Sequence, residues 1–238
     1  MAQETVQTSA PAKEMGVLQR IIGVFTSPRQ TFESVDRKPD WLVPFVIILV
    51  VSLAFTLALR PIMLEEQFEK QREAMLERGM SESQVDEQLQ KGQKIAQITA
   101  PIGALVASAL SLLIVAAVLL FCGNVVMGGE AKFKKVFAVN TWASLIGVLG
   151  IIIKAPFIWQ KQTIQIHFGL AAFLSEDQAK TFLYKVFANV ELFTIWGLIV
   201  LGIGLAVIYK WTTQRALTLV FVLWLIYVFG SAGLASLF

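Results

Sequence analysis

The sequence contains several uncharged apolar runs that are long enough to cross a lipid bilayer. The clearest is the stretch 41–59, which carries no charged residue and lies between Asp40 and Arg60. At about 1.5 Å per residue this run forms a helix of roughly 28 Å, close to the thickness of the hydrocarbon core. Trp41 lies at its edge, where tryptophan typically anchors a helix at the membrane surface. The chain is therefore predicted to be an integral membrane protein.

The composition and the other apolar runs support the same interpretation. Of the 238 residues, 56% are hydrophobic and 16% charged, whereas a soluble domain carries about 25% charged residues. The sequence predicts an all-α, polytopic membrane protein with five transmembrane helices. The expected spans are residues 41–59, 101–126, 136–153, 190–208 and 216–237.

Two short helices are expected ahead of the first span, after a disordered polar tail at residues 1–15. Apolar residues recur at helical spacing in the first of them: Val17, Leu18, Ile21, Ile22 and Phe25. Arg20 falls on the other side, so this helix is amphipathic and suited to lying in the headgroup layer. Ser27 and Pro28 then form a typical helix start, with Ser27 as cap and Pro28 at the first helical position. Residues 16–40 are accordingly predicted to form interfacial helices.

The longest polar segment, residues 60–97, is predicted to form a helical hairpin that stands off the membrane. Gly79 is a typical helix stop. Ser81 and Gln84 have the spacing of a capping box that starts the second helix. The hairpin is rich in both acids and bases, which is compatible with a solvated spacer or with a docking site for a partner.

The distribution of Lys and Arg predicts the orientation. Two short loops, 128–135 and 210–215, hold five basic residues and one acidic residue. The two long segments on the other side mix equal numbers of both charges. Because basic residues favour the cytoplasmic side, the N-terminus is expected in the cytoplasm. With five spans, the C-terminus and the hairpin are then expected on the extracytoplasmic side.

The sequence offers no recognisable catalytic, cofactor-binding or metal-binding motif. Cys122 is the single cysteine and His167 the single histidine, so neither a disulfide nor a typical zinc site is expected. No nucleophile–base pair is visible that would indicate an intramembrane enzyme. The basic residues form no run that would follow a nucleic-acid backbone. We therefore expect no enzyme, no cofactor and no nucleic-acid partner.

Polar residues inside or near the spans are the candidates for interaction. Glu191 lies at the start of the fourth span, where a carboxylate favours the helix dipole. The alternative is a functional acid of a carrier, because intramembrane carboxylates are usually paired or functional. Asn140 and Thr141 in the third span, and Asn124 in the second, are expected to donate hydrogen bonds between helices.

Four segments together resemble the bacterial form of the Yip (Ypt-interacting protein) family. They are residues 21–32, 39–44, 133–137 and 191–205. Ser27 and Pro28 lie in the first segment, and Trp196 lies in the last, ahead of a Leu-Gly-Ile-Gly-Leu run. We take these three residues as further interaction candidates.

The resemblance implies a five-helix membrane domain with a cytoplasmic N-terminus. Eukaryotic relatives act in vesicle trafficking and bind Rab-type GTPases, through a long N-terminal region that is nearly absent here. Some bacterial relatives accompany ABC-type exporters of the MacB kind. A location in the inner (cytoplasmic) membrane follows from the bacterial form.

The function expected from these observations is non-catalytic. The chain is predicted to be a scaffold or accessory subunit that lies in the lipid bilayer and associates with other membrane proteins, with an ABC-type exporter or a second copy of itself as candidate partners. The alternative is a small transporter or a lipid-handling component. A transporter would need polar residues from several helices to line one path.

Overall fold

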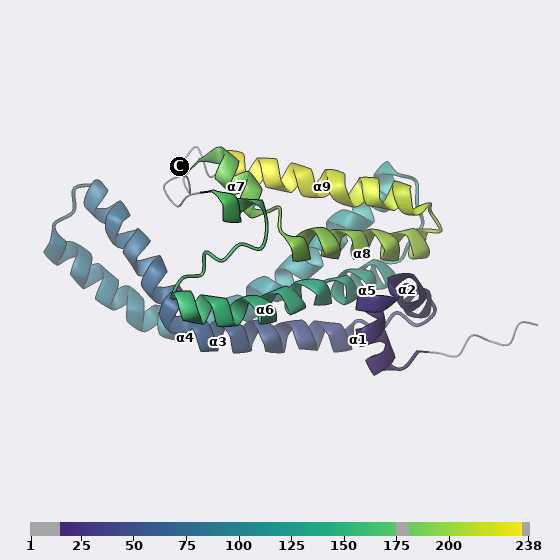
Figure 1. Ribbon diagram of the computed structural model, residues 1–238, viewed down its shortest axis with the longest axis horizontal. Helices are drawn as coiled ribbons and strands as arrows, with labels where there is room; N and C mark the ends of the chain where they lie inside the picture. The colour runs from purple at the N-terminus through teal and green to yellow at the C-terminus, as the bar shows by residue number, and fades with distance from the viewer. Residues whose placement is uncertain (1–14, 175–180, 235–238) are drawn as a thin grey trace, which may run out of the picture.

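A computed structural model describes residues 15–174 and 181–234, so the tail predicted for residues 1–15 lies outside the described residues apart from Met15. The elements, in chain order, are α1 (Val17–Thr26), α2 (Pro28–Arg37), α3 (Leu42–Glu77), α4 (Glu82–Phe121), the π-helix η1 (Cys122–Val126), α5 (Phe133–Ala143), α6 (Leu145–Lys161), the 3-10 helix η2 (Leu170–Phe173), α7 (Phe182–Ala188), α8 (Leu192–Tyr209) and α9 (Thr213–Leu234). Figure 1 shows these helices from purple at the N-terminus to yellow at α9.

Within the described part of the chain, five helical segments are long and apolar enough to cross a membrane. They are α3, α4 with η1, α5 with α6, α8 and α9. The all-α, five-span membrane fold predicted from the sequence is confirmed. The third segment is a pair of helices that meet at Ser144, whose hydroxyl donates to the carbonyl of Asn140 at 2.8 Å.

The third segment also runs past the end expected at residues 153–156. Helix α6 continues to Lys161 with Pro156 inside it. Lys154 lies inside this helix and pairs with Glu191. The sequence predicts a membrane boundary at this lysine because its partner, Glu191, lies far away along the chain.

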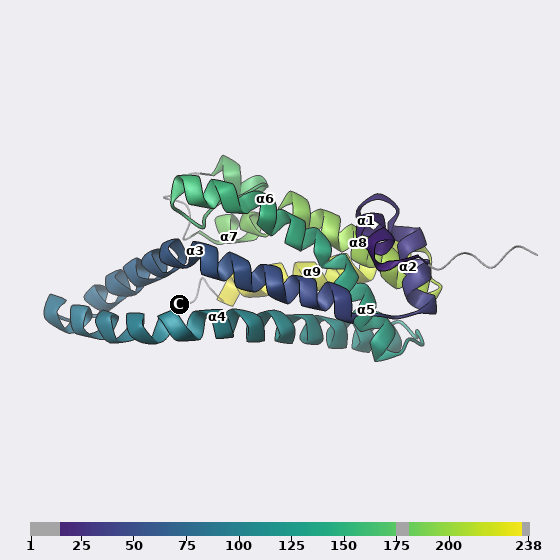
Figure 2. The same ribbon diagram turned by 90° about the horizontal axis from the view of Figure 1, so that it is seen from below.

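Helices α3 and α4 continue beyond their apolar parts into one antiparallel hairpin, which we call the arm (residues 60–97). Figure 2 shows both helices running from the bundle into it. The turn uses Gly79 at a φ of +81°, a left-handed conformation that favours glycine. The capping box predicted for Ser81 and Gln84 is present, with the Ser81 N–H donating to Gln84 Oε1 at 3.1 Å. The arm has its own small apolar core, formed by Phe68, Val85 and Leu89.

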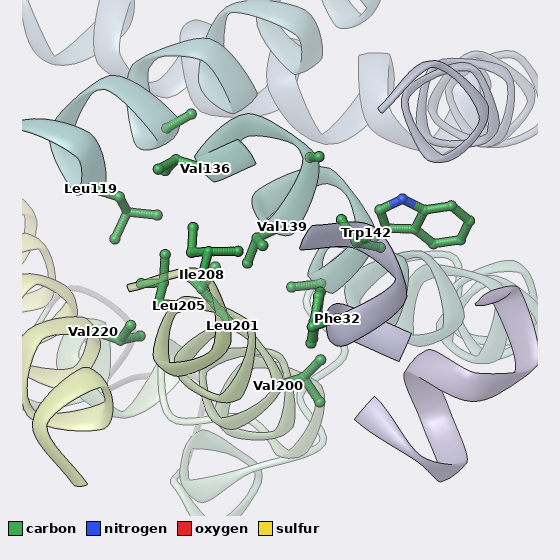
Figure 3. Close-up of a cluster of buried hydrophobic side chains, with 14 of the residues drawn as sticks. Phe32, Leu119, Val136, Val139, Trp142, Val200, Leu201, Leu205, Ile208 and Val220 are labelled. Carbon is green, nitrogen blue, oxygen red and sulfur yellow. The ribbon is translucent and has the colours of Figure 1, made fainter. Parts of the chain in front are cut away.

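The main core lies around α5. Every residue from Val136 to Ala143 is buried, and α5 packs against α2, α4 and α8. Figure 3 shows Val139 of α5 beside Phe32 of α2 and Leu201 of α8, with the indole of Trp142 extending away from them. The Trp142 indole N–H donates to the carbonyl of Asp40 at 2.7 Å.

The glycines of the Leu-Gly-Ile-Gly-Leu run explain the close packing of α8. A Cβ at Gly204 would lie 2.5 Å from Val139 Cγ1 and 3.1 Å from the Phe32 ring. A Cβ at Gly202 would lie 2.5 Å from Leu217 of α9. The motif therefore lets three neighbouring helices approach α8.

Helix α1 turns its charged side inward. Arg20 is 2% exposed and donates to Asp40, to the Lys38 carbonyl at 3.2 Å and to the Ser34 carbonyl at 3.3 Å. Leu18 and Ile22, by contrast, are 69% and 55% exposed. Leu18 and Ile22 of the predicted apolar stripe thus point away from the protein, the direction required for seating in lipid, whereas Ile21 and Phe25 of the same stripe pack against the core.

The segments expected on the same side of the membrane share one end of the molecule. Lys135 at the start of α5 pairs with Asp36 of α2, and Arg215 donates to the Met127 carbonyl at 2.6 Å. The arm contacts the segment after α6 at the opposite end, through Glu66 and Ile164. The fold therefore separates the basic loops from the arm by the length of the bundle (Figure 1).

Candidate functional site

A charged pair joins the ends of two spans at the end of the bundle that carries the arm. Lys154 Nζ of α6 donates to Glu191 Oε2 at the N-terminal boundary of α8. Both side chains are largely shielded, with 21% of Lys154 and 13% of Glu191 exposed. Glu191 makes no side-chain capping hydrogen bond to α8. Glu191 lies at the start of the fourth span, as predicted from the sequence, and it pairs directly with a lysine.

The segment between α6 and α8 adds two more polar side chains to this pair. His167 Nδ1 lies 3.4 Å from Glu191 Oε1, and the Tyr184 hydroxyl lies 3.1 Å from His167 Nε2. The backbone holds the histidine segment against Glu191, since the Leu192 N–H donates to the Phe168 carbonyl at 3.1 Å. His167 Nδ1 is buried and has no hydrogen-bond partner among the described residues. The arrangement is a Lys–Glu–His–Tyr cluster.

A groove of about 380 Å³ opens beside the charged pair. Its lining comes from α6, α4, α3 and the start of α8, and its polar members are Ser108, Ser111, Ser144, Lys154, Glu191 and Thr194. None of the four hydroxyl residues was predicted as a site residue, because they come from separate parts of the chain and form no local pattern. The fold brings them to one groove.

The other polar candidates have structural partners. Asn140 Nδ2 donates to the Leu112 carbonyl at 3.0 Å, which joins α5 to α4 as the sequence suggested. Thr141 donates within its own helix, to the Ala138 carbonyl. Asn124 exchanges two hydrogen bonds with the backbone of Ala131, at 3.0 and 3.1 Å. Asn124 thus closes the loop before α5, whereas a bond between helices was expected.

The N-terminal candidates lie where α1, α2 and α8 meet. Ser27 precedes α2 and Pro28 occupies its first turn, but the Ser27 hydroxyl makes no capping hydrogen bond. The Trp196 ring packs edge-to-face against Phe25 at 5.9 Å and lies 6.4 Å from Phe193. Trp196 therefore joins α1 to α8 as a packing residue.

The comparisons with known proteins agree with this architecture. The Yip1 domain family model matches residues 22–234. The chain belongs to the Yip1 domain family. It is also similar to the membrane protein YknW of Bacillus subtilis (strain 168), with 25% identity over 187 residues, which cover 78% of this chain and 76% of that protein. No solved structure matches it.

In this Yip1 domain, a second polar cluster fixes the base of the arm. The Glu66 carboxylate accepts hydrogen bonds from the Ile164 N–H at 3.1 Å, from Gln165 at 2.9 Å and from Lys70 at 2.8 Å. Partial burial raises the pKa of Glu66, but these hydrogen bonds and the charge of Lys70 outweigh it. The net pKa lies below its ordinary value of about 4.5. We call Glu66 and its partners at residues 163–165 the clasp.

No group of three His, Cys, Asp or Glu side chains in the described part of the Yip1 domain could hold a metal ion. The residues missed by sequence reasoning are Lys154, His167, Tyr184 and Arg20. One signal was available for Lys154, since it is a lone cation within an apolar stretch and Glu191 is a lone acid at the start of another. Such charges usually require partners at membrane depth.

Proposed function

We propose that this Yip1-domain protein is a non-catalytic membrane scaffold or accessory subunit whose arm holds a partner membrane protein. The observation that carries the proposal is the continuity of two spans with the arm. Helix α3 has 36 residues and α4 has 40, whereas a span needs about 20. Residues 60–77 alone extend roughly 27 Å beyond the first span.

The arm has the features of a rigid contact surface. Its two helices share an apolar core of their own, and the clasp connects its base to the bundle. Its outer side carries both signs of charge, including the exposed pairs Lys91–Glu87 and Arg72–Asp86. Such a surface favours a polar, charged partner over lipid.

The charge distribution supports the proposed orientation, and the resemblance to bacterial Yip proteins supports the proposed partner. We place the chain in the inner membrane with the N-terminus in the cytoplasm and the C-terminus and arm outside, because basic residues dominate the end opposite the arm. The partner would be an ABC-type exporter of the MacB kind, as the resemblance to bacterial Yip proteins implies. The arm would reach the extramembrane part of that exporter.

Site-specific photocrosslinking in cells tests this proposal. A photoreactive residue at the exposed arm positions Glu73 or Glu87 should crosslink to an exporter subunit identified by mass spectrometry. The same residue at Ile226 of α9, which is exposed on the apolar surface, should crosslink much less to it. Charge reversal by Lys91→Glu with Arg72→Glu should reduce the arm crosslink. An exporter crosslink at Ile226 with none at the arm would contradict the proposed role of the arm.

The second candidate function is a lipid-handling component, and the groove beside Lys154 and Glu191 favours it. Polar residues of α4, α6 and α8 meet there, so one requirement for handling an amphiphile within the membrane is met. Glu191→Gln distinguishes the two functions in a strain that lacks the wild-type protein. Rescue by Glu191→Gln at equal abundance supports the scaffold, whereas failure to rescue with unchanged stability supports handling of a ligand.

A further inference from the structure

We infer that the groove between α4, α6 and α8 binds a phosphate ester that also carries a primary ammonium, with the ammonium at Glu191 and the phosphate at Lys154. The headgroup of a phosphatidylethanolamine-type lipid has this chemistry. The inference depends on the groove alone and holds whatever the arm binds.

The charges of the site select a ligand with both signs. Lys154 and Glu191 are direct partners, so the empty pair is neutral overall. An anionic ligand on Lys154 would compete with the shielded Glu191 carboxylate for its direct partner, and weakening an ion pair in such a place is costly. A zwitterion replaces the Lys154–Glu191 pair by two ion pairs, one with each side chain, so neither protein charge is left unpaired. Charge complementarity therefore favours a zwitterionic ligand.

The carboxylate geometry further favours a primary ammonium over a quaternary one. Glu191 Oε2 accepts from Lys154, while Oε1 faces the unpartnered His167 Nδ1 at 3.4 Å. A primary ammonium can donate hydrogen bonds to a carboxylate oxygen, and these charge-assisted bonds are the stronger ones. A quaternary ammonium has no N–H to donate. The site should therefore discriminate between the two ammonium types.

The rest of the groove is suited to an apolar chain. It follows α6 from Lys154 towards Ser144, about 15 Å along the helix. The Ser144 hydroxyl donates to Asn140 and the Ser111 hydroxyl to Ser108, so both donors are already engaged within the protein. Much of the remaining lining is apolar: Ile48, Leu112, Val148, Ile151 and Phe193. A lipid would place its headgroup at the charged pair and the start of one chain along α6.

Native mass spectrometry of the full chain, purified in mild detergent, tests the assignment. The protein is exposed to an equimolar mixture of phosphatidylethanolamine, phosphatidylcholine and phosphatidylglycerol with identical acyl chains. We expect phosphatidylethanolamine to be retained over each of the others by about tenfold, the factor that one charge-assisted hydrogen bond can supply. Equal retention of the three lipids, or a preference for phosphatidylglycerol, would overturn the assignment.

Two kinds of variant locate the binding. Lys154→Met and Glu191→Gln should each abolish the preference. Gly147→Leu fills the groove without touching the charges, because a Cβ at Gly147 meets nothing within 4 Å, and it should abolish the preference with the thermal midpoint unchanged. Asp36→Asn breaks a comparable ion pair at the other end and should leave the preference intact. A preference that survives Gly147→Leu would exclude this groove as the site.

A soluble competitor distinguishes a lipid from a free solute with the same headgroup. Glycerophosphoethanolamine at millimolar concentration should not displace the bound lipid if the apolar groove contributes to affinity. Displacement by this compound would confirm the headgroup chemistry and assign the site to a soluble phosphate ester.

Discussion

The bundle core and the two spans that lead into the arm use apolar residues in opposite ways. The most apolar window of the α5–α6 segment has a mean hydropathy of 2.1 and is 67% buried within the protein. The corresponding windows of α3 and α4 have a mean hydropathy of 2.8 but are only 17% buried. The more hydrophobic helices are therefore the ones that face lipid, and the less hydrophobic segment can carry polar residues because it faces protein.

This difference assigns a different role to each region. Around α5 the packing is close, and glycines set the distances between helices. The shape of the arm follows from the continuous helices α3 and α4, and a few hydrogen bonds fix the position of the arm. A change in the core should therefore alter the stability of the whole protein, whereas a change in the arm should alter its position or surface alone.

The largest expected effect is from Gly204→Val in the core. Its Cβ would meet Val139 and Phe32 at 2.5 and 3.1 Å, and overpacking of this kind costs about 1–3 kcal/mol. The thermal midpoint of the purified protein in detergent should fall clearly. Gly230→Val on α9, where a Cβ meets nothing within 4 Å, is the matched control and should not lower it. Equal midpoints for the two variants would contradict the packing role of the glycine run.

A smaller effect is expected at the contact between α5 of the core and α4. Asn140→Leu removes the hydrogen bond to the Leu112 carbonyl between α5 and α4. Bonds between membrane helices contribute about 0.6 kcal/mol on average and up to roughly 1.7 kcal/mol. Unfolding in a mixed detergent should show a loss within that range, while Thr141→Val, which affects a bond within one helix, should show less. No change with Asn140→Leu would mean that this bond does not hold α5 to α4.

Loss of the clasp is expected to change the position of the arm relative to the bundle, with little change in the overall stability of the protein. Because the pKa of Glu66 is lowered in the folded protein, its contribution is complete above the unfolded pKa and is lost as the pH falls below about 4.5. The distribution of electron–electron distances between a spin label on the arm tip and one on α6 should broaden on acidification. Glu66→Gln should show the broad distribution already at pH 7, since a neutral amide has one acceptor oxygen in place of the two carboxylate oxygens that bind Ile164 and Gln165.

A different result would contradict the proposed role of the clasp. Distances that stay narrow at low pH and in Glu66→Gln would show that helix continuity alone fixes the arm. Glu69→Gln, which changes a neighbouring acid outside the clasp, is the control and should behave like the wild type.

The smallest effect is expected on the outer face of the arm. Lys91→Ala breaks the exposed pair with Glu87, and such pairs on helices contribute about 0.3–0.5 kcal/mol. The thermal midpoint should barely move. A large loss of stability would indicate that the arm surface is part of the folded core, against the division drawn between the two regions.

Local patterns predicted the elements and left the tertiary partners open. Uncharged run length located the five spans, and Gly79 with the Ser81–Gln84 spacing located the arm turn, because each is decided by neighbouring residues. Lys154 and Glu191 are far apart along the chain, so no spacing rule could pair them. Without that partner, Lys154 resembled a membrane boundary and α6 was expected to end there.

Arg20 is a second residue whose tertiary contacts could not be predicted from the sequence. Helical periodicity placed it opposite the apolar stripe, and in the structure Arg20 is buried whereas Leu18 and Ile22 are exposed. Which side faces the protein depends on Asp40 and on the carbonyls of Ser34 and Lys38, which lie outside α1. In a membrane protein the polar side of a helix can be the buried one.

We propose that the arm and the basic loops lie on opposite sides of the membrane, with the arm outside. Cysteine labelling in intact cells tests it most directly, after Cys122→Ser has removed the native thiol. With Glu82→Cys at the arm tip, an impermeant maleimide should react in intact cells; with Lys132→Cys in the basic loop, it should react only after permeabilisation. Labelling of Lys132→Cys but not Glu82→Cys in intact cells would reverse the orientation, and equal labelling of both would contradict the two-ended architecture itself.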